Sequence, residues 1–323
     1  MEYASCALCG STKNSAIYRT RDRNWNLPGD FSIVKCSVCN LVFLNPRPDL
    51  DEIGSYYPET FSLRAHHEQG LDNLKIQGAQ WEKVISERLA PLLNIKTAGR
   101  ILDVGCGDCL VLLYMKRLGW DVFGLEPREN AAELARNKFG IDVRSGYLES
   151  SGFEPGFFDA ITLIHVFEHV HKPDAMARQI SQLLAPDGLA LIETPNFDSL
   201  ESRVFRDRWV AIDAPRHLYH FTPETLRAML ENNNLRVLKV FHGSDPGLYK
   251  MGYSESLRQI ASDFGIKKYP AKNVSNTDAP ISTGPKVDSP AKKIESLLFG
   301  ATGSVANLLK MGGRITAVAQ KKS

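Results

Sequence analysis

The stretch RILDVGCGDCLVLLYMKRLGWDVFGLEP, residues 100–127, decides the fold of this 323-residue chain. Within it, ILDVG predicts a strand, GCGDC a glycine turn, LVLLYMKRLGW a helix and DVFGLEP a second strand. Strands that alternate with helices indicate an α/β protein with a doubly wound, mostly parallel sheet. Further strands are expected in IDVRSG, FDAITLIH, GLALIETP and LRVLKVFHG, so this sheet forms the core.

Composition and charge exclude several classes of protein. With 43% hydrophobic and 24% charged residues, the chain is globular rather than disordered or collagen-like. The sequence predicts neither a membrane-spanning helix nor a secretory signal, so a cytoplasmic location is expected. Residues 265–323 hold ten Lys or Arg against three Asp or Glu, whereas the remainder is mildly acidic. An acidic body argues against a nucleic-acid groove.

Four cysteines near the N-terminus form two C-x2-C pairs with 26 residues between them: Cys6, Cys9, Cys36 and Cys39. Zinc prefers four tetrahedral N or S ligands, and each turn presents two thiolates to one ion. Residues 1–50 are therefore predicted to be a zinc ribbon that holds a structural Zn2+. A pair of disulfides is the less favoured alternative in a cytoplasmic chain. Cys106 and Cys109 are expected to be small buried thiols.

The glycine turn predicts a nucleotide-type site. Gly105 and Gly107 let the backbone approach a ligand, and Glu126 ends the second strand, where a carboxylate suits two ribose hydroxyls. A dinucleotide site would want a third glycine where Leu110 stands. Asp103, just before the turn, would repel a pyrophosphate.

This combination resembles the class I S-adenosylmethionine-dependent methyltransferases, whose D-x-G-x-G signature stands here as residues 103–107. The resemblance covers residues 98–243 and resumes in GGRITAVAQKK, which looks like the last, antiparallel strand of that seven-stranded, Rossmann-like sheet. It implies a methyltransferase domain over 98–323, and residues 51–97 are expected to be a helical connector, because apolar residues from Trp81 to Leu93 recur at helical spacing. The residues it implies for binding S-adenosylmethionine are Asp103, Gly105, Cys106, Gly107, Glu126, Pro127, Tyr147, Leu148 and His165, although Tyr147 departs from the usual acid of its loop.

Candidate acceptor-side residues follow strand FDAITLIH, where open α/β sheets place their ligands. The segment His165 to His171 resembles the H-x-x-E-H or E-x-x-E-H stretch of methyltransferases of ubiquinone biosynthesis and of sugar and glycan modification. His165, Glu168 and His169 are therefore expected to bind the acceptor or to act as acid and base. A Mg2+ site is a less favoured variant. Related quinone O-methyltransferases have a cluster of carboxylate and His residues at this place, but His165 replaces the first carboxylate of that cluster. The alternative for His165 is packing in the cofactor pocket, and the alternative for Glu168 and His169 is a structural hydrogen bond.

A second set of candidates lies in the segment FDSLESRVFRDRWVAIDAPRHLYHFTPETL, residues 197–226. Loops of this length are usually functional. Its run PRHLYHFTPETL resembles methyltransferases associated with glycan pathways. His217 is the expected general base, with Asp213 orienting a histidine or binding a hydroxyl. Expected substrate contacts are Trp209, as a stacking wall for a sugar, Arg216, for which a structural ion pair is the stronger alternative, and Tyr219.

About 70 residues, 244–311, form an insertion before the last strand and include an amphipathic helical stretch from Ile294 to Leu309. Docking on the protein or on a second subunit is the favoured interpretation. A sharper hypothesis is peripheral contact of the basic segment 265–310 with a membrane surface, where the acceptor is a lipid-linked glycan.

The leading hypothesis is thus a methyltransferase acting on a hydroxyl of a sugar, glycan or related small molecule. A quinone or aromatic O-methyltransferase and an rRNA methyltransferase are the enzymatic alternatives. The rRNA alternative is disfavoured because residues 1–50 hold six basic against four acidic residues. A non-catalytic partner-binding protein is the remaining class.

Overall fold

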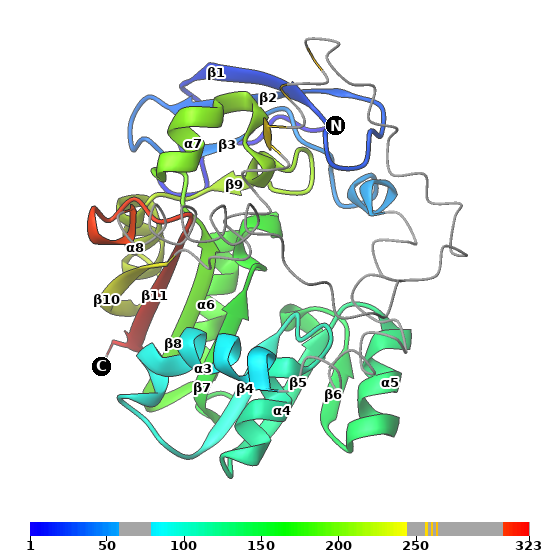
Figure 1. The fold of residues 1–323 in the computed structure, drawn as a ribbon, viewed down its shortest axis with the longest axis vertical. Coiled ribbons are helices and arrows are strands. Elements are labelled where there is room, and N and C mark those ends of the chain that lie inside the picture. Colours follow the sequence, from blue (N-terminus) through cyan, green and yellow to red (C-terminus); the bar gives the residue numbers. More distant parts are fainter. Residues whose placement is uncertain (58–78, 244–255, 258–259, 261–262, 264–305, 323) are drawn as a thin grey trace, which may run out of the picture.

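The computed structural model describes residues 1–57, 79–243, 256–257, 260, 263 and 306–322, and these form two sheets. Figure 1 shows the smaller sheet above the carboxyl edge of the larger one. Most of the insertion 244–311 lies outside the described residues, including residues 294–305 of its expected helix and most of the segment 265–310 proposed to touch a membrane. Leu308 and Leu309, at the end of that expected helix, are described and are exposed.

The larger sheet has seven strands in the order β10-β11-β8-β7-β4-β5-β6. These strands are β4 (Arg100–Val104), β5 (Asp121–Glu126), β6 (Asp142–Ser145), β7 (Phe158–Ile164), β8 (Leu184–Pro195), β10 (Leu235–Gly243) and β11 (Arg314–Lys321). β4 to β8 are parallel, whereas β11 runs antiparallel to both β8 and β10. The predicted seven-stranded, mostly parallel α/β sheet is therefore confirmed.

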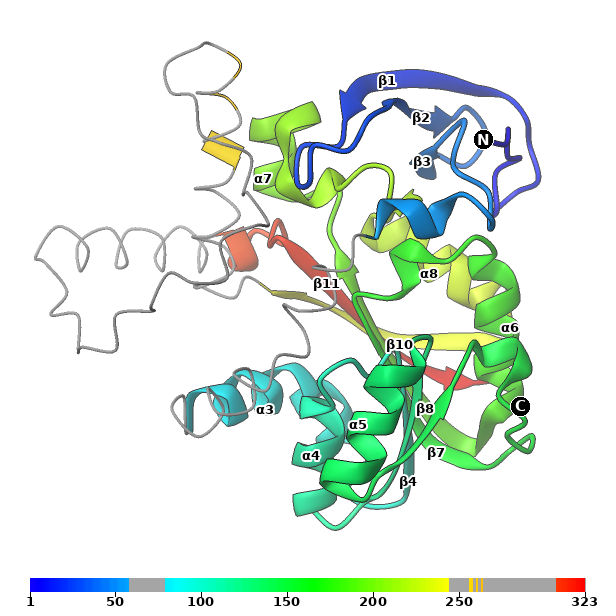
Figure 2. The ribbon, with the colours of Figure 1, turned by 90° about the vertical axis from the view of Figure 1, so that its right-hand side faces the viewer.

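Helices cover both faces of this sheet (Figure 2). One face carries α3 (Ala79–Leu93), α4 (Leu110–Arg117) and α5 (Glu129–Phe139), and the other carries α6 (Pro173–Leu183) and α8 (Pro223–Glu231). Strand residues such as Leu102, Ile161 and Ile192 are fully buried, as expected of a sheet covered on both sides. α8 begins after the N-cap Thr222, which forms a capping box with Thr225.

The smaller sheet is antiparallel and has the order β1-β2-β3-β9. β1 (Asn14–Arg21), β2 (Asp30–Cys36) and β3 (Val42–Leu44) come from the cysteine-bearing N-terminal segment. β9 (Tyr219–His220) comes from the segment after β8, which also holds α7 (Leu200–Phe205), η4 (Arg206–Arg208) and η5 (Val210–Ile212). Val42 pairs with His220 and Phe43 with Tyr219, so the two segments share one sheet.

One hydrophobic core joins the two sheets: it contains Phe31 and Ile33 of β2 together with Phe167 and Leu226 of the larger layer. The first 57 residues therefore pack on the carboxyl edge of the parallel strands. The division into residues 1–50, 51–97 and 98–323 stays a prediction. Among the described residues, no helix is long and apolar enough to cross a membrane.

Candidate active site

The glycine turn after β4 lies at the carboxyl edge of the sheet. Gly105 and Gly107 have φ values of +69° and +49°, which favour glycine. A Cβ at Gly105 would lie 2.6 Å from Val166 Cγ2, so this position has no room for a side chain. Around Gly107, the nearest described atom to an added Cβ is the Gly105 carbonyl at 3.9 Å. The turn is thus open at Gly107, where a ligand can approach the backbone.

Glu126 lies directly beside this turn. Its carboxylate accepts the Gly107 N–H at 3.2 Å and the Arg128 Nε–H at 3.0 Å. The side chain is held at the end of β5, next to the turn, as the sequence predicted for a ribose ligand. Glycines that expose backbone, with a carboxylate beside them, fit a nucleoside cofactor such as S-adenosylmethionine.

The other expected cofactor residues have mixed surroundings. Asp103 is buried and accepts the Thr162 hydroxyl at 2.6 Å, and burial raises the pKa of Asp103 to about 7. Leu148 is buried, whereas Tyr147 and Pro127 are exposed. The Cys106 side chain lies in the interior near Gly124, so only its backbone can face a ligand. Cys106 and Cys109 are both buried, as predicted.

His165 follows β7 and lies between two buried carboxylates. Its Nδ1 is 3.2 Å from Glu168 Oε1 and its Nε2 is 3.5 Å from Glu193 Oε1. Its φ of 55° is unusual for a residue with a side chain, and such strain often accompanies functional sites. His165 therefore connects the end of β8, where Glu193 lies, with η3 (Phe167–His169).

Glu168, His169 and His217 each place one side-chain nitrogen or oxygen within 4.8 Å of the others. Burial alone would raise the pKa of Glu168, but His165 and the other imidazoles lower it to about 2. Burial, helped by the nearby His217, lowers the pKa of His169 to about 4, so this ring is neutral at neutral pH. The sequence-predicted candidates from two distant segments thus meet in one cluster.

The backbone selects the tautomers of both histidines. His169 Nδ1 is 3.1 Å from the Arg216 carbonyl, and His217 Nδ1 is 2.8 Å from the Ala211 carbonyl. A carbonyl can only accept, so each Nδ1 carries a proton, and in the neutral form of each ring Nε2 is the nitrogen with the lone pair. Among the described residues, Glu168 Oε2 is buried without a hydrogen-bond partner.

The spacing of this cluster would also admit a metal ion. Mg2+ prefers oxygen ligands, however, and two of the three groups are imidazoles. The cluster therefore does not favour the Mg2+ variant.

Asp213 and Arg216 form a buried ionic network beside His217. The guanidinium contacts Asp22 at 2.7 and 3.0 Å, Asp213 at 2.6 to 3.2 Å and the Tyr56 carbonyl at 3.1 Å. Burial opposes the charge on Arg216, but the two carboxylates raise its pKa above the usual range. Asp213 Oδ2 lies 3.9 Å from His217 Nε2. Asp213 is thus positioned to stabilise a charged His217.

The three residues expected to contact substrate have structural roles instead. Arg216 is fully buried and its donors are engaged, which corrects the substrate role and supports the ion-pair alternative. Tyr219 is 2% exposed, donates to the His171 carbonyl and accepts from Arg47. Trp209 is 3% exposed, and its indole donates to Glu201. Tyr219 thus offers no face to a sugar, whereas Trp209, although almost wholly buried, is one of the residues that line a pocket next to Asp213.

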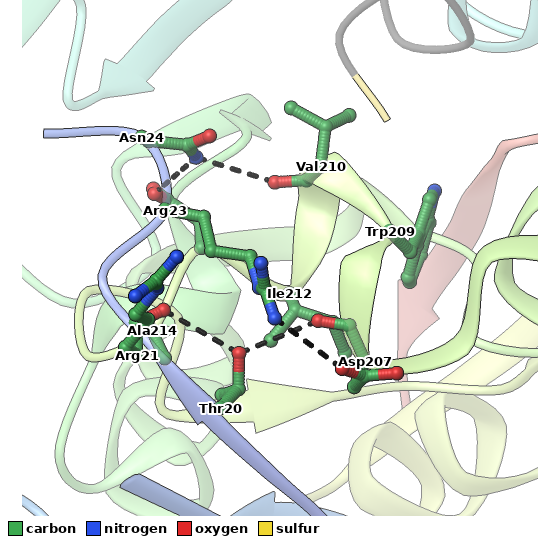
Figure 3. Close-up of a pocket in the computed structure, with 10 residues that line it drawn as sticks. Thr20, Arg21, Arg23, Asn24, Asp207, Trp209, Val210, Ile212 and Ala214 are labelled. Carbon is green, nitrogen blue, oxygen red and sulfur yellow. Dashed lines mark hydrogen bonds and ion pairs between the residues drawn. The ribbon is translucent and has the colours of Figure 1, made fainter. Parts of the chain in front are cut away.

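A small pocket opens next to Asp213, between the end of β1 and the segment 207–214 (Figure 3). Its lining includes the polar side chains of Thr20, Arg21, Arg23, Asn24, Asp207 and Asp213. Asn24 donates to the Val210 carbonyl at 3.3 Å and to Asp213 at 2.5 Å. Asp213 therefore borders both this pocket and the histidine cluster.

The four N-terminal cysteines converge, as predicted. Cys6 and Cys39 have their sulfurs 3.3 Å apart, and those of Cys9 and Cys36 are 3.5 Å apart. These distances exceed a disulfide bond and approach the ~3.8 Å that separates thiolates on a tetrahedral zinc ion. The four residues could therefore hold one metal ion.

Two residues beside the cluster of Glu168, His169 and His217 had been given no role from the sequence. Tyr57 Oη lies 3.0 Å from His169 Nδ1, across 112 residues of chain. Glu193 is fully buried beside His165, Arg88, Arg314 and Thr316. For Glu193, the sequence offered one signal of a functional residue, a carboxylate at the end of an apolar strand. For Tyr57 it offered none.

Residues 64–240 match the family described as a methyltransferase domain, and the chain belongs to that family. It is 31% identical over 150 residues to the ubiquinone biosynthesis O-methyltransferase of Xanthomonas oryzae pv. oryzae, covering 43% of this chain and 63% of that protein. The protein of that name from Xanthomonas axonopodis pv. citri is 30% identical over 165 residues, covering 47% of this chain and 67% of that protein. The chain thus spans less than two thirds of the first of these relatives.

Among solved structures, the chain is similar to a chain from the complex between the Haloferax volcanii Trm112 methyltransferase activator and its methyltransferase partner. The TM-score is 0.52 at 13% identity, and the match covers 84% of this chain and 98% of that chain. At this identity the similarity concerns the fold alone.

Replacing Arg216 tests its structural role. Arg216→Met keeps the apolar stem but leaves Asp22 and Asp213 buried without their cation. We expect the free energy of unfolding to fall by about 3–5 kcal/mol. Chemical denaturation followed by circular dichroism measures it, with Arg19→Met on the exposed side of β1 as the control, for which a change within ~0.5 kcal/mol is expected. Equal stability of the two variants would contradict the structural role.

Proposed function

We propose that this protein transfers the methyl group of S-adenosylmethionine to a hydroxyl of a sugar, a glycan or a related polyhydroxylated small molecule. The observation that carries the proposal is the position of His217. Its Nε2 lies 3.9 Å from Asp213, which also borders a pocket lined by polar and apolar residues. The glycine turn and Glu126 lie at the carboxyl edge of the seven-stranded sheet, on which the first 57 residues pack.

The cofactor is proposed to lie along the turn between β4 and α4. Backbone at Gly105 and Gly107 would face it, Glu126 would accept hydrogen bonds from its ribose hydroxyls, and Leu148 would border its adenine. When bound, S-adenosylmethionine supplies a methyl group on a sulfonium, so no charge has to be created on the donor. The protein's task is to position the acceptor and remove its proton.

His217 is the proposed general base. Nε2 of His217 would accept the proton that the acceptor hydroxyl gives up as its oxygen takes the methyl group, and the donor would be left as a neutral thioether. The imidazolium is then stabilised by Asp213. Burial alone would raise the pKa of Asp213, but the nearby His217 and Arg216 lower it, so this carboxylate is charged at neutral pH. His169 and Glu168 are proposed to orient the acceptor from the other side of His217.

The acceptor class is proposed from the pocket beside Asp213. Its Asp, Asn, Arg and Thr side chains can bind the hydroxyls of a sugar, and the apolar residues Trp209, Val210, Ile212 and Ala214 that complete its lining can contact the carbon atoms of the same ring. The second candidate acceptor is a hydroxyl of a quinone or aromatic molecule. The similarity of this chain to the ubiquinone biosynthesis O-methyltransferases of Xanthomonas supports this candidate. A lipid-linked acceptor, membrane contact through 265–310 and a cytoplasmic location stay predictions.

The cysteine cluster is proposed to hold one structural Zn2+. Four thiolates would close the coordination shell, so the ion would organise the N-terminal segment and take no part in methyl transfer. Burial alone would raise the pKa of Cys36, but backbone N–H groups of Cys39 and Val38 contribute to lowering it to about 7, which favours a thiolate.

Zinc analysis tests this site. We expect one zinc per chain by native mass spectrometry, and its loss in Cys36→Ser, because a structural site needs all four ligands. Cys106→Ser, which removes a buried thiol outside the cluster, should keep the metal. A wild-type protein purified without chelators that contains no metal would contradict the proposal.

Calorimetry tests the cofactor. Wild-type protein should bind S-adenosylmethionine, and Glu126→Ala should bind it about 10- to 100-fold more weakly, because hydrogen bonds to a charged group contribute ~1.5–3 kcal/mol. Asp121→Ala, at the opposite end of β5, should bind like wild type. Failure of the wild-type protein to bind would overturn the proposed function.

Transfer of labelled methyl groups tests the acceptor and the base together. We expect label in sugar or glycan fractions rather than in quinols or RNA. In His217→Ala, kcat should fall about 100- to 10,000-fold with cofactor affinity unchanged, because the acceptor loses its general base. His242→Ala, on β10 and outside the cluster, is the control. Label in quinols would favour the second candidate, and undiminished kcat in His217→Ala would remove His217 from the mechanism.

A further inference from the structure

The cysteine-bearing N-terminal segment reaches into the acceptor side of the site. We propose that its loop of residues 22–27 positions the general base, with Asn24 acting as a positioning residue through Asp213. This inference rests on the proposed function for its catalytic meaning, but its contacts are independent of the acceptor's identity.

The loop is folded around one buried carboxylate. Asp22 is 0% exposed and accepts the backbone N–H groups of Asn24, Trp25 and Leu27 at 3.0 to 3.4 Å. The same carboxylate binds the Arg216 guanidinium. Because one group serves both purposes, the loop conformation and the position of the segment around Arg216 are coupled.

Asn24 completes the connection to the base. Its Nδ2 donates to Asp213 Oδ1 at 2.5 Å and to the Val210 carbonyl at 3.3 Å. Asp213 has a φ of 34°, a left-handed conformation that a non-glycine residue adopts only when its surroundings hold it. Its carbonyl accepts the backbone N–H groups of Arg216 and His217, so the position of Asp213 determines where His217 lies.

The carboxylate of Asp213 is oriented by the same contacts. Oδ1 accepts from Asn24 and Arg216, whereas Oδ2 accepts from Arg216 Nε at 3.2 Å and lies 3.9 Å from His217 Nε2. Loss of the Asn24 amide would leave Arg216 as the remaining side-chain hydrogen-bond donor to this carboxylate among the described residues and would so loosen its orientation, while the Asp22–Arg216 ion pair still holds the two segments together. Asn24 can therefore be removed without separating them.

Tyr57 supplies a second, independent contact from the same part of the chain. Its hydroxyl lies 3.0 Å from Nδ1 of His169, whose ring stands edge-on to that of His217, with centroids 4.6 Å apart. Residues of the first 57 thus contact His169 directly, through Tyr57, and His217 indirectly, through the bond from Asn24 to Asp213.

The test uses the full chain with 15N-labelled histidine and follows the imidazole resonances by NMR. Asn24→Ala is expected to shift the His217 resonances, assigned by their loss in His217→Gln, and Asn24→Ser, which retains a donor, to shift them less. Asn14→Ala removes a side-chain amide that, among the described residues, donates to the Thr12 carbonyl, and it should leave the resonances in place. Unchanged His217 resonances in both Asn24 variants would overturn the inference.

Kinetics separates positioning from general stability. With the acceptor in hand, Asn24→Ala should lower kcat about tenfold with cofactor affinity unchanged, and should cause no further loss in an Asp213→Asn background. Equal losses in the two backgrounds would contradict action through Asp213. Should the wild-type protein bind no S-adenosylmethionine, the proposed function fails, whereas the NMR comparison still decides the inference.

Discussion

A single guanidinium group, that of Arg216, joins the two halves of the acceptor side. It is fully buried between Asp22, from the N-terminal segment, and Asp213, from the segment after β8. A buried charge without a partner is strongly unfavourable, so these segments must come together for either to fold as observed. The pairing of β3 with β9 and the shared core reinforce this constraint. The acceptor side is consequently built from two distant parts of the chain, whereas the glycine turn and Glu126 belong to one βαβ unit.

That difference explains how much could be predicted from the sequence. The sheet and the turn at Gly105 were predictable, because local hydrophobic patterns and glycine positions specify a βαβ unit. The pairs of cysteines were recognisable from their spacing. Glu168, His169 and His217 were found individually as candidates, and the structure adds that they meet in one cluster.

The remaining contacts could not be predicted, because they depend on which distant segments pair. Nothing near Arg216 in the sequence indicates that Asp22 lies against it, and burial of Trp209 and Tyr219 follows from packing of the smaller sheet. Polar and aromatic residues crowded into a loop predicted substrate contacts, yet several of them hold the loop itself together. Tyr57, which lies against His169, left no sequence signal because its partner is 112 residues away.

The central claim is that the N-terminal segment and the segment after β8 form one structural unit at the acceptor side. Hydrogen exchange measured by mass spectrometry on wild type and Asp22→Asn tests it most directly. The account predicts reduced amide protection in residues 20–27 and also in 206–220, with residues 100–126 unchanged, because the hydrogen bonds of Asp22 and Arg216 to described residues do not involve residues 100–126. A loss of protection confined to residues 20–27 would contradict it.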